Sequence, residues 1–526
     1  MHVFAVVPIV VNAGAAVLPA VVAAVASFAV LLFKPRELIR LLRQRRRAVG
    51  MAAGGVIIAV AGALWWHSSA LAQRASHNEV RLSGRLDWAK VAEDIIAQEK
   101  LHQSNVEPTN SQFPSDSAVQ STSEIDYART LVIGNQSPAG LIPVWSFRPE
   151  GTLFFSDAAI FGKRIFAAGC QQDLGAYTGL LTCLDLDTGK PIWEKTEDAN
   201  GPLKPFFSSP ALIKDGKYLV IGQGLHQDRE CSLLCFDTAT GAQVWAVKTP
   251  GHIESSPAIL GDVAVVGVGA IEGADGKAVG DPGLVLAVHI PDGKTLWKQP
   301  VNDPESSPAI DENGTVYIGS GLNGQSVVAI RSDSGDELQK KKVSRIVWQT
   351  GVGQPMLGPI TLTGQTVIAA GGNGDMVHSS STPQGLVVAF NPTDGKILWQ
   401  TSLPDAVLGS VAYVDGRLIC PVRNGEVVGL AASDGQIQWR ARISGQAPVL
   451  AGCAATKERI YAVSDDGYLA ALATQDGKVL EKIYLNAQSQ PGTGLSISSP
   501  LVIGQRVIVG SESGGLRCLQ GSGGAR

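Results

Sequence analysis

Apolar residues along most of this chain come in short runs that are separated by tight turns. From about Trp145 onward, a short apolar strand is followed by a turn such as Lys214-Asp-Gly or Val414-Asp-Gly and by a second apolar strand. A third apolar strand comes next, as at Gly385–Phe390. Glycine suits these turns because tight turns require a positive φ angle. The pattern predicts antiparallel β-strands.

A tryptophan marks the fourth strand of the repeating unit. It follows a turn of the type Asp187-Thr-Gly-Lys-Pro-Ile-Trp193, and the units recur at intervals of 40 to 52 residues. Such a period is typical of propeller blades of four strands each. We expect the indoles to be structural, filling the wedge between neighbouring blades near the rim. These tryptophans are Trp145, Trp193, Trp245, Trp297, Trp348, Trp399 and Trp439.

The two ends of the repeat region complement each other. Seven complete units run from Trp145 to Glu481, which replaces the tryptophan after the last turn. Residues 498–520 supply three strands without a Trp strand, whereas residues 142–147 supply a Trp strand alone. We therefore predict an eighth blade built from both ends, which closes the ring and removes exposed sheet edges.

Two long apolar segments precede the repeats. Residues 1–33 are nearly uncharged and residues 48–66 end in two tryptophans, so each is long enough to span a bilayer. The loop between them, 34–47, has seven basic residues and one acidic residue, which places it in the cytoplasm. The sequence thus predicts two transmembrane segments in the inner membrane, with the propeller in the periplasm or outside. The alternative is a cleaved signal peptide ending near Ala70-Leu-Ala.

The remaining boundaries follow from composition. Residues 67–101 are expected to form a juxtamembrane segment with a short amphipathic helix. Residues 102–141 are rich in polar residues and are predicted to be a disordered linker. The propeller is predicted to span 142–520, followed by a flexible tail at 521–526.

Charge and cysteine content narrow the class of partner. The chain has a net charge of −4, of which the loop 34–47 contributes +6, so the remainder carries −10. This mildly acidic remainder argues against binding to nucleic acid. The seven cysteines form no C-x-x-C pair, and we interpret them as small buried residues. Cys231 and Cys235 could still pair in an oxidising compartment.

Candidate binding residues gather in loops of variable length. Loops between the second and third strands share one face with the connections between blades, and the long loops belong to this class. We call this the decorated face, and we place function there because variable loops on a rigid scaffold commonly bind. The candidates are His226, Asp228, Arg229, His252, Glu254, Glu305, Asp375 and His378.

Two of these candidates suggest a cation, although no metal is expected. Glu254 and Glu305 each directly precede a Ser-Ser-Pro motif, so they occupy equivalent places near the mouth of the axial channel. Paired carboxylates are weak candidates for a hard cation such as calcium. The alternative interpretation is that both glutamates are solvated rim residues or cap loop amides.

The Asp-x-x-Thr-Gly turn before tryptophan and the Ser-Ser-Pro strand resemble the repeats of a known superfamily. They are similar to the tryptophan-docked repeats of the quinoprotein alcohol dehydrogenase-like (PQQ-like repeat) β-propellers, over residues 142–520. The resemblance implies an all-β, eight-bladed propeller. This superfamily includes dehydrogenases that use pyrroloquinoline quinone (PQQ) and the outer-membrane assembly protein BamB.

The resemblance implies two possible functions. The leading hypothesis is a BamB-like, non-enzymatic scaffold of the cell envelope that binds an envelope protein or polymer and uses no cofactor. The alternative is a membrane-bound, PQQ-dependent dehydrogenase that oxidises an alcohol or sugar with PQQ and calcium. Catalytic members of the superfamily commonly stack the quinone on a disulfide between adjacent cysteines, and this sequence has no adjacent cysteines. No catalytic residue is predicted.

Overall fold

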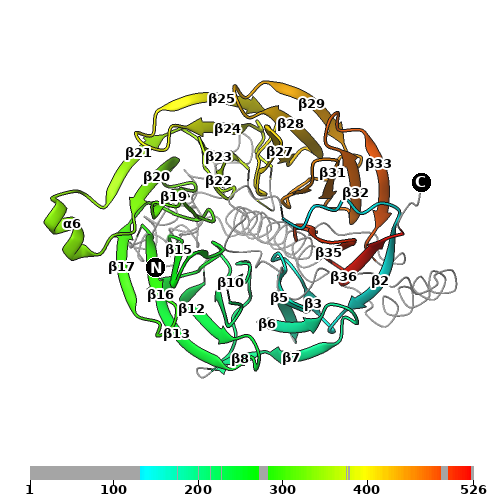
Figure 1. The fold of residues 1–526 in the computed structure, drawn as a ribbon, viewed down its shortest axis with the longest axis horizontal. Coiled ribbons are helices and arrows are strands. Elements are labelled where there is room, and N and C mark those ends of the chain that lie inside the picture. The colour runs from blue at the N-terminus through cyan, green and yellow to red at the C-terminus, as the bar shows by residue number, and fades with distance from the viewer. Residues whose placement is uncertain are drawn as a thin grey trace, which may run out of the picture. The chain divides into compact units, whose positions relative to one another are not determined.

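The computed structural model of the protein is an all-β propeller in which eight sheets surround one axis (Figure 1). The fold class predicted from the repeats is therefore confirmed. The residues that the structure describes are 131–173, 176–198, 201–213, 215–226, 228–271, 282–374, 376, 379–486 and 496–522.

Blades 1 to 4 follow one another along the chain. Blade 1 contains β3 (Thr152–Leu153), β4 (Ala159–Phe161), β5 (Arg164–Asp173), β6 (Ala176–Asp185) and β7 (Pro191–Lys195). Blade 2 contains β10 (Ala211–Leu212), β11 (Tyr218–Gly222), β12 (Arg229–Asp237) and β13 (Gln243–Gly251). Blade 3 contains β14 (Ala258–Leu260), β15 (Val263–Val268), β16 (Leu284–His289) and β17 (Thr295–Pro300). Blade 4 contains β18 (Ala309–Ile310), β19 (Thr315–Gly319), β20 (Ser326–Arg331) and β21 (Ile346–Gly351).

Blades 5 to 8 complete the ring. Blade 5 contains β22 (Thr361–Leu362), β23 (Val367–Gly372), β24 (Gly385–Phe390) and β25 (Ile397–Leu403). Blade 6 contains β26 (Ala412–Val414), β27 (Arg417–Val422), β28 (Glu426–Ala431) and β29 (Ile437–Arg442). Blade 7 contains β30 (Ala454–Ala455), β31 (Arg459–Val463), β32 (Tyr468–Ala473) and β33 (Val479–Tyr484). Blade 8 contains β1 (Val132–Ile133), β34 (Leu501–Ile503), β35 (Arg506–Ser511), β36 (Gly515–Gly521) and β2 (Leu141–Phe147).

Two small elements lie outside the blades. A ribbon of β8 (Glu197–Asp198) and β9 (Gly201–Pro202) follows blade 1. Helix α6 (Gly335–Lys341) interrupts blade 4 between β20 and β21, and it protrudes from the rim (Figure 1). A capping box between Ser334 and Glu337 starts this helix, and two basic residues, Lys340 and Lys341, lie in its last turn.

The core lies between the blades. All six residues of β24 are buried, because its sheet is covered on both faces by neighbouring blades. One cluster, for example, joins Val220 and Leu233 of blade 2 to Val266 and Leu286 of blade 3. Rim strands such as β25 instead consist mostly of exposed and half-buried residues. Each repeat therefore forms one blade, and the faces of each blade are buried against the two neighbouring blades.

Blade 8 combines both ends of the repeat region, as the sequence predicts. Strand β2 pairs antiparallel with β36, and Trp145 lies opposite Cys518. Figure 1 shows the early strand, in cyan, beside the last strand, in red. Since β2 comes from the beginning of the described chain and β36 from its end, their ladder closes the ring.

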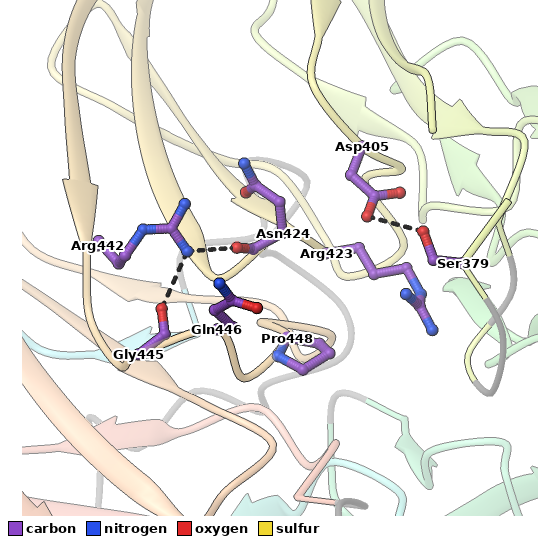
Figure 2. Close-up of a pocket in the computed structure, with 8 residues that line it drawn as sticks. All are labelled: Ser379, Asp405, Arg423, Asn424, Arg442, Gly445, Gln446 and Pro448. Carbon is purple, nitrogen blue, oxygen red and sulfur yellow. Dashed lines mark hydrogen bonds between the residues drawn. The ribbon is translucent and has the colours of Figure 1, made fainter. Parts of the chain in front are cut away.

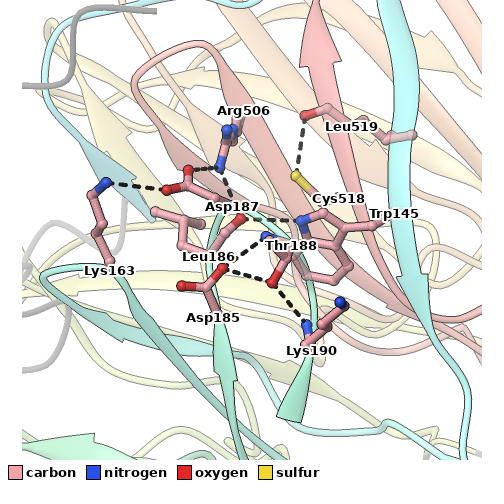
Figure 3. Close-up of polar contacts among 10 residues, drawn as sticks. All are labelled: Trp145, Lys163, Asp185, Leu186, Asp187, Thr188, Lys190, Arg506, Cys518 and Leu519. Atoms are coloured by element: carbon pink, nitrogen blue, oxygen red, sulfur yellow. Dashed lines mark hydrogen bonds and ion pairs between the residues drawn. The ribbon is translucent and has the colours of Figure 1, made fainter. Parts of the chain in front are cut away.

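Polar contacts then attach blade 8 to the rim turn of blade 1 (Figure 3). Trp145 Nε1 donates to the carbonyl oxygen of Leu186 at 3.0 Å. Arg506 Nη1 donates to the same oxygen at 2.8 Å and to Asp187 Oδ1 at 2.9 Å. Lys163 Nζ lies 3.1 Å from Asp187 Oδ2. One turn of blade 1 is thus held by side chains from both ends of the repeat region.

The structure differs from the expected linker 102–141 at its end. Val132 and Ile133 form β1, which pairs parallel with Val502 and Ile503 of blade 8. Their side chains pack against the cores on either side of that blade. This apolar run is too short to change the polar average of the segment around it. It finds a strand to pair with only when the ring closes.

The predictions for the N-terminal region lie outside the described residues. This applies to both predicted transmembrane segments (1–33 and 48–66), the loop 34–47, the juxtamembrane segment 67–101 and the linker up to residue 130. Within the described part of the chain, no helix has the length and apolar character needed to cross a membrane.

Candidate functional site

The connections between blades bring a ring of equivalent side chains to the propeller axis. Each ring residue lies four positions before the inner-strand residue that pairs with the second strand, as Glu254 does before Ala258 and Leu408 before Ala412. We call this set the axial ring. From blade 1 to blade 8 it consists of Phe155, Phe207, Glu254, Glu305, Leu357, Leu408, Leu450 and Ile497.

Six of the eight ring residues are apolar and pack together. They belong to one cluster that runs through six consecutive blades, 5, 6, 7, 8, 1 and 2. The rings of Phe155 and Phe207 lie 5.2 Å apart between centroids. Apolar ring residues of neighbouring blades thus form one continuous apolar arc on this face.

The two other ring residues, Glu254 and Glu305, lie in a cluster with two histidines. His226 comes from the loop between β11 and β12, and His252 from the same connection as Glu254. Oε1 of Glu305 lies 3.5 Å from His226 Nδ1 and 3.4 Å from His252 Nε2. His226 Nδ1 lies 3.9 Å from Glu254 Oε1, and the two imidazole centroids are 4.9 Å apart. We call these four residues the His–Glu cluster.

Burial changes the acidity of this cluster. Burial, together with the charges of Asp303 and Glu254, raises the pKa of Glu305 to about 7, although both histidines act against the rise. Burial works to lower the pKa of His252. Its hydrogen bond to Glu305 and the charges of both glutamates outweigh burial, so this pKa lies above its ordinary value. The cluster can therefore take up or release a proton near neutral pH.

A third carboxylate, Asp303, lies close to that of Glu305. It is fully buried and takes a left-handed φ of +53°. Its Oδ2 accepts a hydrogen bond from the Asn323 backbone at 3.0 Å. Its Oδ1 and the Nδ1 of the buried His252 have no hydrogen-bond partner among the described residues. Polar atoms left in this state are rare in folded proteins, so they mark the cluster as unusual.

The structure brings together four of the eight residues predicted for the binding face. Asp228 supports this group from outside, because its Oδ2 accepts a hydrogen bond from Leu225 N at 2.9 Å and so fixes the loop of His226. Arg229 is exposed at the start of β12, where its carbonyl oxygen accepts a hydrogen bond from Lys204 Nζ. Asp375 and His378 lie outside the described residues.

A polar hollow on the same face was not predicted. It has a volume of about 610 Å³ and lies where blades 5, 6 and 7 meet (Figure 2). Arg442 Nη1 donates to the carbonyl oxygens of Asn424 and Gly445 at 2.6 and 3.1 Å, which fixes one wall. Its lining residues are Ser379, Asp405, Arg423, Asn424, Arg442, Gly445, Gln446 and Pro448.

The sequence contained a weak signal for this hollow. Arg423 and Asn424 lie in a loop between second and third strands, and Gln446 lies in a connection between blades. Both positions belong to the classes of loop that make up the decorated face. The predicted candidates instead come from long loops and from the connections that enter blades 3 and 4.

The seven cysteines are all buried free thiols, in agreement with their interpretation as small core residues. Cys231 and Cys235 lie on one strand, β12, and do not form a disulfide. Burial raises the pKa of each of these two thiols to about 12. They therefore remain protonated at neutral pH and are poor nucleophiles.

Comparison with known proteins finds similarity to BamB proteins and to a quinoprotein alcohol dehydrogenase. A family model described as outer membrane protein assembly factor BamB matches residues 177–377 and 383–526. The outer membrane protein assembly factor BamB of Yersinia pestis is 24% identical over 367 residues, which cover 67% of this chain and 81% of that protein. The quinoprotein alcohol dehydrogenase PedH of Pseudomonas putida is 25% identical over 275 residues, which cover 49% of this chain and 41% of that protein.

A solved structure shares the fold. The crystal structure of BamB from Moraxella catarrhalis matches with a TM-score of 0.52 and 16% sequence identity. The match covers 72% of this chain and 99% of that chain. At this identity the likeness concerns the propeller architecture and leaves the binding residues undefined.

Proposed function

Because this chain belongs to the outer membrane protein assembly factor BamB family, we propose that it is a non-enzymatic scaffold of the cell envelope. In this proposal the decorated face binds another protein, and the partner is itself an outer-membrane assembly protein. The two apolar segments at 1–33 and 48–66 anchor the chain in the inner membrane, with the propeller in the periplasm.

The observation that carries this proposal is the polar hollow between blades 5, 6 and 7. Its lining offers hydrogen-bond donors and acceptors, and Pro448 is its only apolar side chain among the described residues. Pockets for small substrates are instead mostly apolar and bury most of their ligand. A polar, open surface of this kind suits a protein segment, whose backbone and side chains can hydrogen-bond to Asn424, Arg442 and Gln446.

The test places a photoreactive amino acid on each face of the full-length protein in its own cells. Gln446, exposed in the hollow, is compared with Lys478, exposed in a rim turn on the opposite face. We expect a discrete adduct with an outer-membrane assembly protein from position 446, identified by mass spectrometry, and none from position 478. Unattached protein at both positions, or the same adducts from both, would contradict the proposal.

The dehydrogenase alternative has a direct test. The purified full-length chain is incubated with PQQ and calcium, and reduction of an electron-accepting dye is followed with a panel of alcohols and sugars. We expect no turnover above a control without protein. Sustained PQQ-dependent turnover would overturn the non-enzymatic proposal.

A further inference from the structure

The axial ring changes its chemistry at two neighbouring blades. Blades 3 and 4 carry Glu254 and Glu305 at the position where the other six blades carry Phe, Leu or Ile. Two neighbouring carboxylates beside the six apolar ring residues improve neither packing nor solubility. Charged groups near the protein interior need compensating partners. This departure from the repeat therefore indicates a specific local role.

The two histidines complete a set of ligand atoms with suitable spacing. Ligand atoms of His226, His252 and Glu254 all lie within 4.8 Å of one another. Glu305 Oε1 lies 3.5 and 3.4 Å from the nearest nitrogens of the two histidines. In a tetrahedral zinc site with bonds of about 2.0–2.1 Å, neighbouring ligand atoms are about 3.4 Å apart. The two closest pairs, both made by Glu305, already have this spacing. His226 Nδ1 and Glu254 Oε1 are 3.9 Å apart, which is slightly longer.

We propose that His226, His252, Glu254 and Glu305 bind a divalent transition-metal ion such as zinc. The two imidazole nitrogens favour this class of metal over calcium or magnesium, which prefer oxygen ligands throughout. This site is independent of the proposed partner-binding surface, because it lies at blades 2 to 4 and the hollow lies at blades 5 to 7.

The charge balance of the region supports a bound cation. Glu254, Glu305 and the buried Asp303 bring three carboxylates together against two histidines. Asp303 Oδ1 has no hydrogen-bond partner in the described chain, although its side chain is fully buried. A divalent ion would compensate the carboxylates that this region brings together.

The ligands are held by rigid connections. Ser255 Oγ accepts a hydrogen bond from Gly267 N at 3.1 Å, directly after Glu254. Ser256 N donates to Ser307 Oγ at 3.0 Å, which joins the connections that carry the two glutamates. The backbone of the connections that carry Glu254 and Glu305 is therefore fixed before any ion arrives, which lowers the entropic cost of binding. Bound metal would tie the His226 loop of blade 2 to blades 3 and 4.

The experiment titrates the full-length protein, purified with a histidine-free tag and stripped with a chelator, with zinc alone. We expect one zinc ion per chain by calorimetry and a higher melting temperature of the zinc-loaded protein. Cobalt in place of zinc should give the visible absorption of a tetrahedral site. His226→Gln, at a side chain that is 41% exposed, should weaken zinc binding at least tenfold without loss of folding.

His289→Gln is the matched control, because His289 is also partly exposed and paired with a carboxylate, Asp292, but lies at the end of β16 outside the cluster. It should bind zinc as the unchanged protein does. Glu254→Gln is a second variant within the cluster and should also weaken binding. Absence of saturable binding, or binding that His226→Gln leaves unchanged, would overturn the proposal.

Discussion

At the junction between blades 7 and 8, a carboxylate takes the place of the indole that links other blades. Glu481 lies opposite Ala471 in the ladder of blade 7, as Trp439 lies opposite Gly429 in blade 6. Its Oε1 and Oε2 accept hydrogen bonds from the backbone nitrogens of Leu141 (2.6 Å) and Gly140 (3.1 Å). Blade 8 has no glycine turn on which an indole could dock, since its rim strand comes from the N-terminal side. Glu481 instead satisfies backbone donors where that strand begins.

Replacing this carboxylate should weaken the junction. We expect Glu481→Ala to lower the free energy of unfolding by about 1–3 kcal/mol, because two backbone donors lose their acceptor. Thermal or denaturant unfolding of the full-length protein measures the change. Glu194→Ala, at an exposed glutamate on the rim strand of blade 1, is the control and should have little effect. Equal effects of the two substitutions would contradict this role for Glu481.

At the scale of the element, the tryptophan of one blade docks on the rim turn of the next blade, and the two together join the blades. Trp399 of blade 5 donates from Nε1 to the Ala432 carbonyl oxygen at 3.2 Å. Its ring covers Gly435, where an added Cβ atom would lie 2.4 Å from Trp399 Cε3. Gly435 also has a φ of +73°. Glycine is therefore required there for two separate reasons, the backbone conformation and the docked indole.

Two glycines of blade 6 allow the effect of the backbone conformation to be measured separately from the effect of the docked indole. Gly416 lies in the turn between the first two strands with a φ of +77°, but an added Cβ would meet no atom within 4 Å. We expect Gly416→Ala to cost about 1–2 kcal/mol from backbone strain alone. Gly435→Ala should cost about 2–4 kcal/mol, because displacement of the indole is added. Unfolding measurements that find equal costs would show that docking adds nothing.

The docking also tolerates an insertion. In blade 4 the rim turn is replaced by a segment that contains α6, yet Trp297 of blade 3 still donates from Nε1 to the Ser332 carbonyl oxygen at 3.1 Å. The guanidinium carbon of Arg345 lies 4.7 Å from the centroid of the indole and covers the ring. A cation–π contact thus stands where a glycine turn lies in most other blades.

At the scale of the whole molecule, stability depends on how the ring is closed. The joint between blades 8 and 1 combines Trp145, Arg506 and Asp187 around one turn (Figure 3). Burial works to raise the pKa of Asp187. Hydrogen bonds from Lys163 and Arg506 outweigh it, so this pKa lies below its ordinary value of 3.8. The ionised aspartate therefore favours the closed ring.

This joint should make the ring sensitive to acid. Because the pKa of Asp187 is lower in the folded state, its contribution to stability is present above about pH 4 and is lost as the pH falls through the folded-state value. We expect Asp187→Asn to lower the melting temperature at pH 7, with a smaller difference near pH 3. Asp262→Asn, at an exposed aspartate in a turn of blade 3, should show no such pH dependence. A difference that stays constant with pH would contradict the role of the charge.

Fold and site differ in how far the sequence could predict them. The period of the tryptophan turns and the complementary ends were enough to predict eight blades and the ladder of β2 with β36. The sequence also placed Glu254 and Glu305 at equivalent positions, whereas it could not pair them with His226 and His252. Strand β1 was not predicted, because the strand that pairs with it, β34, lies far away in the sequence.

What the sequence by itself determined is the architecture. Turns, strand lengths and docking residues are local features of the sequence, and they recur in each blade. What only the tertiary structure decided is the chemistry of the decorated face. The His–Glu cluster gathers side chains from three blades, and the polar hollow gathers side chains from loops of several more. Such groups depend on the rotation from one blade to the next and on the path of each loop, which the spacing of residues along the chain does not encode.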